Sequence, residues 1–582
     1  MTDIHYYKSK KIDLGNLTQR FQENSSSHKK IEYNPFHIHP LQNYNPIYSM
    51  FFEMNPTNYN AIALNHPNHF VDLNTVLEEG TGKKISKEIH IKYAPLLDPI
   101  HYLIGKYEKE RNRLTILPTI GKSGTEFKVL PKIESLYNSA YIDCFFSYLS
   151  SNLLHRFQFK NGIDFYGSYL GVQEKFKMDI SDDYDYLLES DFFYSKNNIL
   201  YEIESSIDLP MEENIKGSSF SMKPKLHLGE VVSENIEIDA DILDTDSEIE
   251  PIQLEEVSDL ELVYENEKEK EISSDDSDDN SIENESVSVG EEGEEDDWSD
   301  IEDSLGSEDS FQEPIIHAYI HNFPIQMICL EKGEGTLDAL LENNELEDNQ
   351  IASALFQVVM SLAAYQKAYN FTHNDLHTNN IIYFSTDYTH IEYTFLEKTY
   401  KVPTYGRIYK IIDFGRSIYR FQDKVLGSDS FAPGGDAHGQ YNCEPFFNPN
   451  KPEIKPNPSF DLCRLGCSMY DLIFDGLEEN NIRKSRKKWT EVQKTIARWC
   501  MDDKGKNILY KSNGEERYPN FKLYKMIARM VHAHTPENQM AFPLFSQYDV
   551  STKKKKKVIH PMDCIYKINI DTIPKCYVSS SV

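Results

Sequence analysis

The chain has 582 residues, enough for about two to four average domains or one large domain with insertions. Hydrophobic residues make up 39% of it, which is low for a fully globular chain, so we expect part of it to lack a packed core. Of the formal charge of −34, −33 falls within residues 230–313, which hold 35 acidic residues and 2 lysines. A nearly neutral body with one strongly acidic segment argues against nucleic acid as a partner.

The N-terminus and the cysteines indicate a protein that stays inside a cell. The opening "MTDIHYYKSKKIDLGN" has no apolar core of signal-peptide length, and no window approaches about 18 apolar residues. We therefore expect neither secretion nor a membrane partner. The eight cysteines do not suggest a disulfide framework in a chain of this length. Cys463 and Cys467 lie one helical turn apart without a matching pair for a metal, so buried thiols in a reducing compartment are expected.

The first part of the chain predicts a loose arm followed by a small mixed lobe. Residues 1–45 are polar and show little periodicity, so we expect a flexible N-terminal arm. Within 60–229, the strand-like runs "EIHIKYAPLL" and "GIDFYGSYLGVQ" flank the helical stretch "SLYNSAYIDCFFSYLSSNLLH". In that helix the apolar residues recur at helical spacing and form one stripe: Ile142, Phe145, Phe146, Leu149 and Leu153. Strands combined with one amphipathic helix favour a small α+β lobe.

Residues 230–313 interrupt this pattern. A run such as "SSDDSDDNSIENESVSVGEEGEEDDWSD" cannot bury enough apolar surface to offset its ordering entropy, and its charges repel one another. We expect a long disordered acidic insertion. Its charge would attract basic proteins, although a solvated spacer explains the composition equally well.

Residues 314–545 predict a strand, a turn and a mostly helical lobe. An apolar strand in "FPIQMICLEKGEGTLDALL" precedes the helical "DNQIASALFQVVMSLAAYQKAY", and the pattern from 460 to 535 is again mostly helical. The tail, 546–582, carries a lysine run at 553–557. That run is either a solvated flank or a nuclear-import patch.

Two polar stretches in the second lobe have the composition of a phosphoryl-transfer site. "HNDLHTNN" supplies Asp375 and Asn380, and the strand-like "YKIIDFG" supplies Asp413. Phosphoryl transfer needs a carboxylate to orient the attacking hydroxyl and oxygen ligands for magnesium. These residues provide that set, whereas the alternative is a polar turn between a helix and a strand.

These stretches resemble the motifs of the protein kinase superfamily. "HNDLHTNN" is similar to the catalytic loop H-R-D-L-x-x-x-N, "DFG" to the magnesium-binding motif, and "DLCRLG", with Asp461 and Gly466, to the helix that supports that loop. The resemblance covers roughly 60–545 and is strongest to the kinases of large nucleocytoplasmic DNA viruses. It implies a bilobal α+β kinase fold in which Asp375 is the catalytic base and Asn380 and Asp413 hold the metal.

The resemblance also implies nucleotide-binding residues in the first lobe. Lys92 of "IHIKYAPLL" would contact the phosphates, unless it is an ordinary solvent-facing strand lysine. Its acidic partner would be Asp143 or Glu134. Backbone groups of the hinge beginning at Glu331 would bind adenine. No G-x-G-x-x-G is present, and the glycines of "EEGTGKK" are expected to form a tight turn between strands.

Three departures from the kinase pattern affect the expected activity. Asn374 stands where the arginine that receives an activation-loop phosphate is usual, and His377 stands where a lysine or arginine reaches the γ-phosphate. No A-P-E triplet follows "DFG".

We therefore expect an ATP-dependent serine/threonine protein kinase that uses Mg²⁺ or Mn²⁺ and acts on a protein substrate. Residues 230–313 would add binding to basic proteins. If the protein is viral, it would work in the host cytoplasm or the virion. One alternative is a catalytically weak pseudokinase scaffold that binds basic partners through the acidic insertion. Another is a small-molecule phosphotransferase on the same fold.

Overall fold

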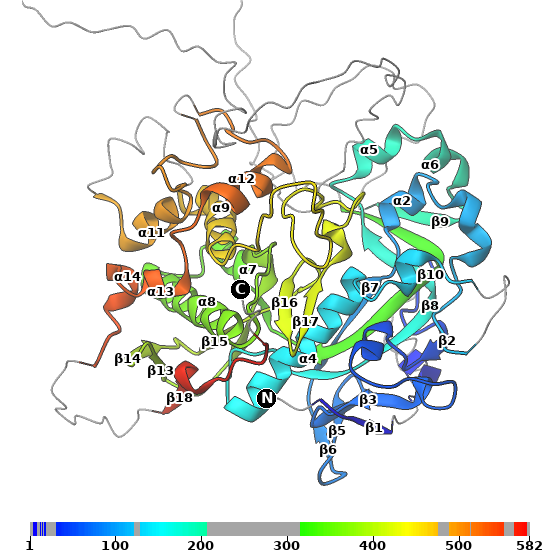
Figure 1. Cartoon of the computed structure of the whole chain (residues 1–582), viewed down its shortest axis with the longest axis horizontal. Coiled ribbons are helices and arrows are strands. Elements are labelled where there is room, and N and C mark those ends of the chain that lie inside the picture. The colour runs from blue at the N-terminus through cyan, green and yellow to red at the C-terminus, as the bar shows by residue number, and fades with distance from the viewer. Residues whose placement is uncertain are drawn as a thin grey trace, which may run out of the picture. The chain divides into compact units, whose positions relative to one another are not determined.

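A computed structural model describes most of the chain outside the acidic segment. The described residues are 31–121, 128–205, 315–474, 488–511, 514–551 and 564–578, with short pieces at 4–8, 12, 14–15 and 17–18. All of them belong to one unit, which comprises Met1–Ser233 and Pro314–Val582. The insertion predicted over 230–313 lies outside the described residues. Within this unit the fold is mixed α/β, with several small sheets (Figure 1).

The largest sheet has five strands, and all of its pairs are antiparallel. Its order is β2–β8–β10–β7, with β9 pairing to part of β10. The strands are β2 (Ile38–Gln42), β7 (Ile89–Pro95), β8 (Phe165–Asp179), β9 (Tyr201–Ser205) and β10 (Ile316–Glu331). The three strands predicted from apolar runs, β7, β8 and β10, are confirmed. β8 and β10 are buried along most of their lengths, as expected for strands covered on both faces.

Helix α4 (Ser139–Phe157) packs against this sheet. The side chain of Asn138 caps its first turn by accepting a hydrogen bond from the backbone N–H of Ala140. The predicted apolar stripe of α4 is buried throughout. Figure 1 shows α4 between the sheet and the hairpin of β16 (Ile418–Phe421) and β17 (Lys424–Gly427), which pair with each other.

The acidic segment joins two neighbouring strands. β9 ends at Ser205, and the Cα partner of Ser205 is Ile316, the first residue of β10. The residues between them therefore leave and re-enter the sheet at the same place. This arrangement fits an insertion into the sheet.

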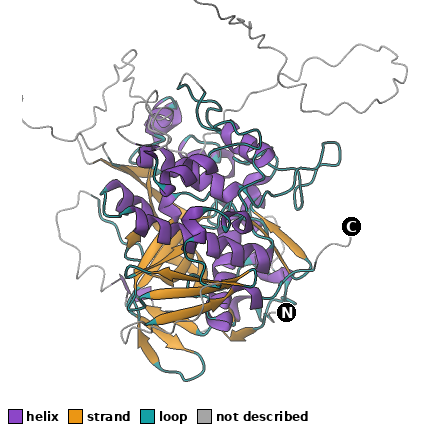
Figure 2. Cartoon of the chain, turned by 90° about the vertical axis from the view of Figure 1, so that its left-hand side faces the viewer, coloured by secondary structure: helices purple, strands orange, loops and turns teal. Residues whose placement is uncertain are grey.

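The second half of the chain supplies most of the long helices among the described residues. Figure 2 shows the helices gathered above and beside the strands. The predicted long helix is α8 (Asp348–Tyr369), whose capping box joins Glu347 and Gln350. The other α-helices among the described residues of this half are α7 (Leu337–Glu342), α9 (Phe460–Phe474), α11 (Glu491–Trp499), α12 (Lys522–Met530), α13 (Pro536–Gln539) and α14 (Pro543–Ser546). Among the described residues, no helix is both long and apolar enough to cross a bilayer.

Two small sheets lie in the same half. One has the order β11–β12–β15, with β11 (Gly335–Thr336), β12 (Ile381–Ser385) and β15 (Arg407–Ile411). The other has the order β14–β13–β18, with β13 (His390–Phe395), β14 (Lys398–Pro403) and β18 (Ile565–Asn569). β18 comes from the chain's last residues and runs parallel to β13.

The first half also contains short elements around the main sheet. The strands are β1 (Tyr6–Lys8), β3 (Ile62–Leu64), β4 (Asn68–Asp72), β5 (Thr75–Glu78) and β6 (Lys84–Ser86). The helices are α2 (Pro99–Leu103), α3 (Pro131–Glu134), α5 (Tyr184–Leu188) and α6 (Asp191–Lys196). The glycines of "EEGTGKK" form the predicted turn, which joins β5 to β6 and has Gly82 at φ +65°.

The expectation of a flexible arm over 1–45 is wrong for the described residues there. β1 pairs with β3, and β2 is an edge strand of the main sheet. Phe36 and Ile38 are buried in the core. Because these strands are short and do not alternate apolar with polar residues, they leave little periodic signal in the sequence, and their order depends on distant partners.

Candidate active site

Lys92 of β7 lies between two carboxylates. Its Nζ is 2.6 Å from Oδ2 of Asp143 on α4 and 2.8 Å from Oδ1 of Asp413 after β15. Burial by itself would lower the pKa of Lys92, but the two carboxylates raise it above its usual value. The lysine therefore stays charged, and its contacts differ from those of a solvent-facing strand lysine.

Asp143, and not Glu134, is the acid that meets Lys92. Asp143 is 3% exposed, and its second oxygen, Oδ1, accepts a hydrogen bond of 2.9 Å from the backbone N–H of Phe414. Asp143 thus joins α4 to both Lys92 and the residue after Asp413. Glu134 ends the short helix α3 and is exposed.

Asp413 combines a strained backbone with an accessible side chain. Its φ is +64°, in the left-handed region that non-glycine residues rarely adopt and that is often found at functional sites. Burial raises the pKa of Asp413, but Lys92 outweighs this effect and brings it to about 2. The side chain is 47% exposed. A charged carboxylate is therefore available to a ligand.

Asn380 lies beside Asp413 because of strand pairing. Ile381 of β12 pairs with Ile411 of β15, and the backbone N–H of Ile412 donates to the carbonyl oxygen of Asn380. The amide nitrogen of Asn380 donates to the Asp375 carbonyl oxygen at 3.0 Å and lies 3.0 Å from Nε2 of a nearby histidine. Among the described residues, the side-chain oxygen of Asn380 has no hydrogen-bond partner, so it can face a ligand.

The loop that carries Asp375 is fixed by α9. Asp461, which is fully buried, accepts hydrogen bonds of 2.9 Å from the backbone N–H groups of His373 and Asn374. A Cβ on Gly466 would lie 2.7 Å from Cβ of Trp499, so glycine permits the close contact of α9 with α11. The helix that carries "DLCRLG" therefore supports the loop through Asp461.

Asn374 joins the loop to the segment after Asp413 through neutral hydrogen bonds. Its amide donates to the carbonyl oxygen of Arg416 at 3.0 Å and to Oγ1 of Thr372 at 3.2 Å, and its side-chain oxygen accepts from the hydroxyl of Tyr441 at 2.8 Å. Asn374 is buried. Position 374 therefore carries a neutral amide whose bonds are made within the chain.

Asp375 is held by a tyrosine and two arginines. The hydroxyl of Tyr524 on α12 donates to its Oδ1 at 2.9 Å, Arg464 lies 3.7 Å from the same oxygen, and Arg416 lies 3.6 Å from Oδ2. Burial opposes the charge, but the arginines hold the pKa of Asp375 below its usual value. The carboxylate is therefore charged near neutral pH and is available to act as a proton acceptor.

His377 is neutral in this setting. Burial and then the charge of Arg464 lower its pKa to about 4. The side chain at position 377 is thus uncharged near neutral pH. Arg416 and Arg464 are the cations that contact Asp375.

Glu331 lies three residues beyond Ile328, the cross-strand partner of Lys92, at the end of β10. Its backbone N–H donates to the carbonyl oxygen of Asp164 at 3.0 Å, and its side chain forms an ion pair with Lys410. The structure places Glu331 on the strand next to Lys92, three positions along the sheet, and its side chain bonds to Lys410 and to the backbone N–H of Asp164.

The oxygen ligands present here are compatible with Mg²⁺ bound together with a nucleotide. Asp413 offers a carboxylate and Asn380 an amide oxygen, and Mg²⁺ generally takes its remaining ligands from phosphate and water. Among the described residues, no group of three or more His, Cys, Asp or Glu side chains could hold a metal on its own.

Sequence reasoning missed the residues that surround Asp375. Tyr524 lies 149 residues after Asp375, and nothing in its neighbourhood marks it. Arg464 stands within "DLCRLG", so that motif could have indicated it. Arg416 directly follows "DFG", but a charged residue at that position does not by itself indicate a contact with Asp375.

Comparison with known proteins gives a partial match. No model of a known protein family matches the chain. Over 118 residues it is 33% identical to the serine/threonine-protein kinase haspin of Mus musculus, a stretch that covers 19% of this chain and 15% of haspin. The similarity indicates a protein kinase-like relationship for part of the chain. The matched stretch spans far less than two thirds of haspin.

Proposed function

We propose that the protein is an ATP-dependent serine/threonine protein kinase with a bilobal kinase-like fold. The observation that carries this proposal is the position of Lys92, with Nζ 2.6 Å from Asp143 and 2.8 Å from Asp413. A charged lysine beside a reachable carboxylate suits the phosphates of a nucleotide. The partial similarity to haspin supports the same reaction class.

In this proposal the residues divide the work of phosphoryl transfer. Asp413 and Asn380 would hold Mg²⁺, which neutralises charge on the phosphate oxygens when bound. Lys92 would bind the α- and β-phosphates and keep Asp413 oriented. Asp375 would accept the proton of the attacking hydroxyl, and Tyr524 would fix its carboxylate.

The proposed domains follow the sequence boundaries. Residues 60–229 would form the N-lobe, 230–313 an acidic insertion, and 314–545 the hinge and C-lobe, with backbone groups from Glu331 to Gly335 facing adenine. We also propose a protein substrate, basic partners for 230–313, and a relationship to the kinases of large DNA viruses.

The test combines nucleotide binding with transfer. We expect ATP to raise the melting temperature of the full-length protein only when Mg²⁺ or Mn²⁺ is present, and radiolabelled phosphate to pass from ATP to a mixture of generic proteins. Asp413→Ala should abolish both effects, and Lys92→Met should weaken transfer. A metal-independent thermal shift of equal size, together with no transfer by the wild type, would overturn the proposal.

One observation favours the pseudokinase scaffold as a second candidate. His377, with a pKa of about 4, does not supply the cation that usually faces the γ-phosphate near neutral pH. In that case Mg²⁺ and ATP would still stabilise the protein, but transfer would be absent in the wild type. The same assay separates the two functions.

A further inference from the structure

The segment after "DFG" is tied to the start of α4 by one carboxylate. Asp429 begins the short 3₁₀ helix Asp429–Phe431. Its Oδ1 accepts a hydrogen bond of 3.1 Å from the backbone N–H of Ser139, and its Oδ2 lies 3.1 Å from Nζ of Lys132. Its own backbone N–H donates to the carbonyl oxygen of Tyr137 at 2.7 Å. The Asp429 side chain is 11% exposed, so the carboxylate is largely shielded from solvent.

This contact lies on the face of α4 that carries Asp143. Ser139 and Asp143 are four residues apart, and residues with this spacing lie one above the other on a helix. The same segment touches α4 at two further points: the N–H of Phe414 donates to Asp143, and the hydroxyl of Tyr419 donates to the carbonyl oxygen of Ile142 at 3.0 Å. Of these contacts, the one made by Asp429 lies at the N-terminus of α4, where a negative charge is favourable.

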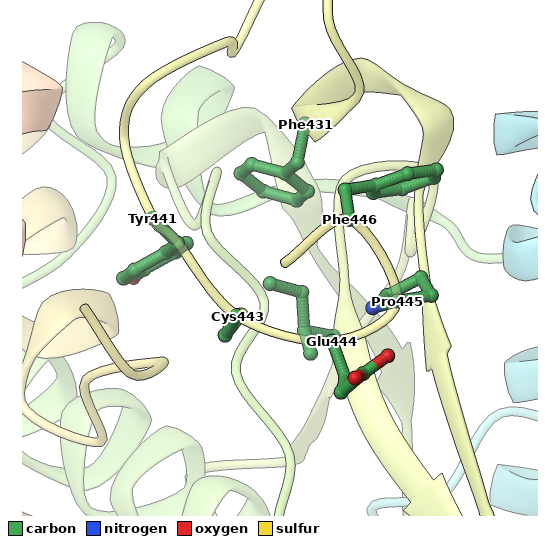
Figure 3. A pocket seen from close by; sticks show the side chains of 7 residues that line it. Phe431, Tyr441, Cys443, Glu444, Pro445 and Phe446 are labelled. Atoms are coloured by element: carbon green, nitrogen blue, oxygen red, sulfur yellow. The ribbon is translucent and has the colours of Figure 1, made fainter. Parts of the chain in front are cut away.

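A second line of contacts joins the same place to the loop of Asp375. The ring of Phe431 lies 5.6 Å from that of Tyr441, whose hydroxyl donates to Asn374 at 2.8 Å. Figure 3 shows Phe431, Tyr441 and Phe446 around a small pocket on this path. The ring of Phe446 in turn lies 5.5 Å from Tyr137, beside the Asp429 contact. The segment is thus attached both to α4 and to the loop.

We propose that Asp429 is a positioning residue that fixes α4, and with it the Lys92–Asp143–Asp413 set, without any phosphorylation of the segment. This inference rests on the proposed function. An added phosphate commonly orders such a segment by pairing with a cation. Here a carboxylate encoded in the sequence already bonds to Lys132 and the helix start, and an amide occupies position 374.

Two cations beside this contact are already paired with carboxylates. Lys132 pairs with Asp429, and Arg416 pairs with Asp436 and contacts Asp375. Gly435 allows the chain to fold back tightly over Asp429, because a Cβ there would lie 2.6 Å from the Asp429 carbonyl oxygen and 2.3 Å from that of Ser430. Glycine at this position therefore keeps the turn packed against the backbone of Asp429 and Ser430.

The test compares Asp429→Asn and Lys132→Met with Asp423→Asn in the full-length protein. Asp423 is an exposed carboxylate that pairs only with its neighbour Lys424, so it controls for the loss of one negative charge in the same segment. Asp429→Asn keeps the shape but places an amide against Lys132. We expect kcat to fall about tenfold or more, the scale of losing a charge-assisted hydrogen bond, with KM for ATP changed less. Asp429→Glu should restore part of the loss.

A second readout does not depend on turnover. Hydrogen exchange of the peptide that begins α4 should become faster in Asp429→Asn and Lys132→Met but not in Asp423→Asn. Phosphatase-treated wild type, with its unmodified mass verified, should retain full kcat. Unchanged exchange in both variants, or loss of kcat on phosphatase treatment, would overturn the inference. Absence of transfer in the wild type would refute the proposed function instead, while the exchange comparison would still decide the role of Asp429.

Discussion

Asp375 remains charged in a setting where burial by itself would raise its pKa. The guanidinium groups of Arg416 and Arg464 oppose the effect of burial, and Tyr524 donates directly to Oδ1. Because Tyr524 occupies Oδ1 in this way, the proposed role of Asp375 as a proton acceptor assigns Oδ2 to the substrate hydroxyl. The arginine near Oδ2 keeps it ionised at a distance of 3.6 Å.

Tyr524→Phe should therefore lower kcat while leaving nucleotide affinity nearly unchanged. The change removes one hydroxyl and leaves Arg464 without the acceptor of its Nε–H, so we expect a loss of about 1–3 kcal/mol, roughly 5- to 150-fold. Steady-state kinetics at varied ATP will measure it. Tyr510→Phe is the matched control, because its hydroxyl bonds to the surface residue Asp471. Equal kcat in the two variants would refute the role of Tyr524.

Functional residues that belong to short motifs could be predicted from the sequence. Residues whose partners are distant in the sequence could not. The loop of Asp375 and the supporting Asp461 were recognisable because "HNDLHTNN" and "DLCRLG" have characteristic spacings. Lys92 was recognisable from its apolar strand neighbours, but the choice between Asp143 and Glu134 required the position of α4. Asp429 was not predictable, because it lies 290 residues from Ser139 and has no motif of its own.

The chain's last residues complete a sheet of the second half. β18 pairs with β13, and Lys367 of α8 donates to the carbonyl oxygens of Ile570 and Asp571 at 2.9 and 2.7 Å. The carboxylate of Asp571 accepts from the N–H groups of the turn residues Leu396 and Glu397, which both have positive φ. Such turns favour glycine or asparagine, so Asp571 stabilises an otherwise unfavourable hairpin.

Ile570→Ala should destabilise the protein measurably. Ile570 is fully buried, and removing a buried side chain of this size costs about 2–5 kcal/mol. Urea unfolding of the full-length protein will give the difference in free energy. Val578→Ala, at a position 53% exposed, should change it little. If both variants unfold at the same urea concentration, the tail does not pack as described.

Elements with strong periodicity were predictable, and those ordered by distant partners were not. α4 and α8 have apolar stripes at helical spacing, and β7, β8 and β10 have apolar runs, so the sequence indicated all five. β1, β2 and β18 are short and pair with strands far away in the sequence. Their register is set by those partners, which no local pattern encodes.

Buried neutral histidines should make the whole molecule sensitive to acid. Burial lowers the pKa of His66 to about 3 and that of His377 to about 4. The unfolded chain binds these protons near pH 6.5, so folding stability falls as the pH drops below about 6.5 and continues to fall until the folded groups titrate. Each pKa unit corresponds to about 1.4 kcal/mol, so the combined loss reaches several kcal/mol near pH 4.

Melting temperatures between pH 7.5 and 4.5 will test this prediction. His66→Gln should melt with a shallower pH dependence than the wild type, because one titrating group is removed. The exposed His438→Gln should retain the wild-type slope. Identical slopes in all three proteins would contradict the prediction.

The acidic segment should be dispensable for the chemistry. Its flanking strands meet at Ser205 and Ile316, so the sheet can close without it. We expect deletion of 230–313 to leave phosphorylation of a short peptide intact and to weaken binding to histones at low salt. The difference should shrink above about 0.15 M salt, where the Debye length is roughly 8 Å.

A neutral Gly/Ser segment of equal length will separate charge from spacing. If that replacement binds histones as the wild type does, the segment is a spacer. If deletion unfolds the protein, 230–313 contributes to the fold. The insertion between the two proposed lobes was predicted from its composition, because a segment with high net charge and few apolar residues is not expected to form a packed core. Composition carries no information about which residues are in contact.

The central claim is that Asp375 accepts the proton of a hydroxyl during transfer from ATP. The most direct measurement is the phosphotransfer rate of purified Asp375→Asn beside the wild type, with binding of Mg²⁺ and ATP followed by thermal shift. The account predicts that the variant binds nucleotide as the wild type does and transfers phosphate at least about 10²- to 10⁴-fold more slowly. Near-normal transfer by Asp375→Asn would contradict it.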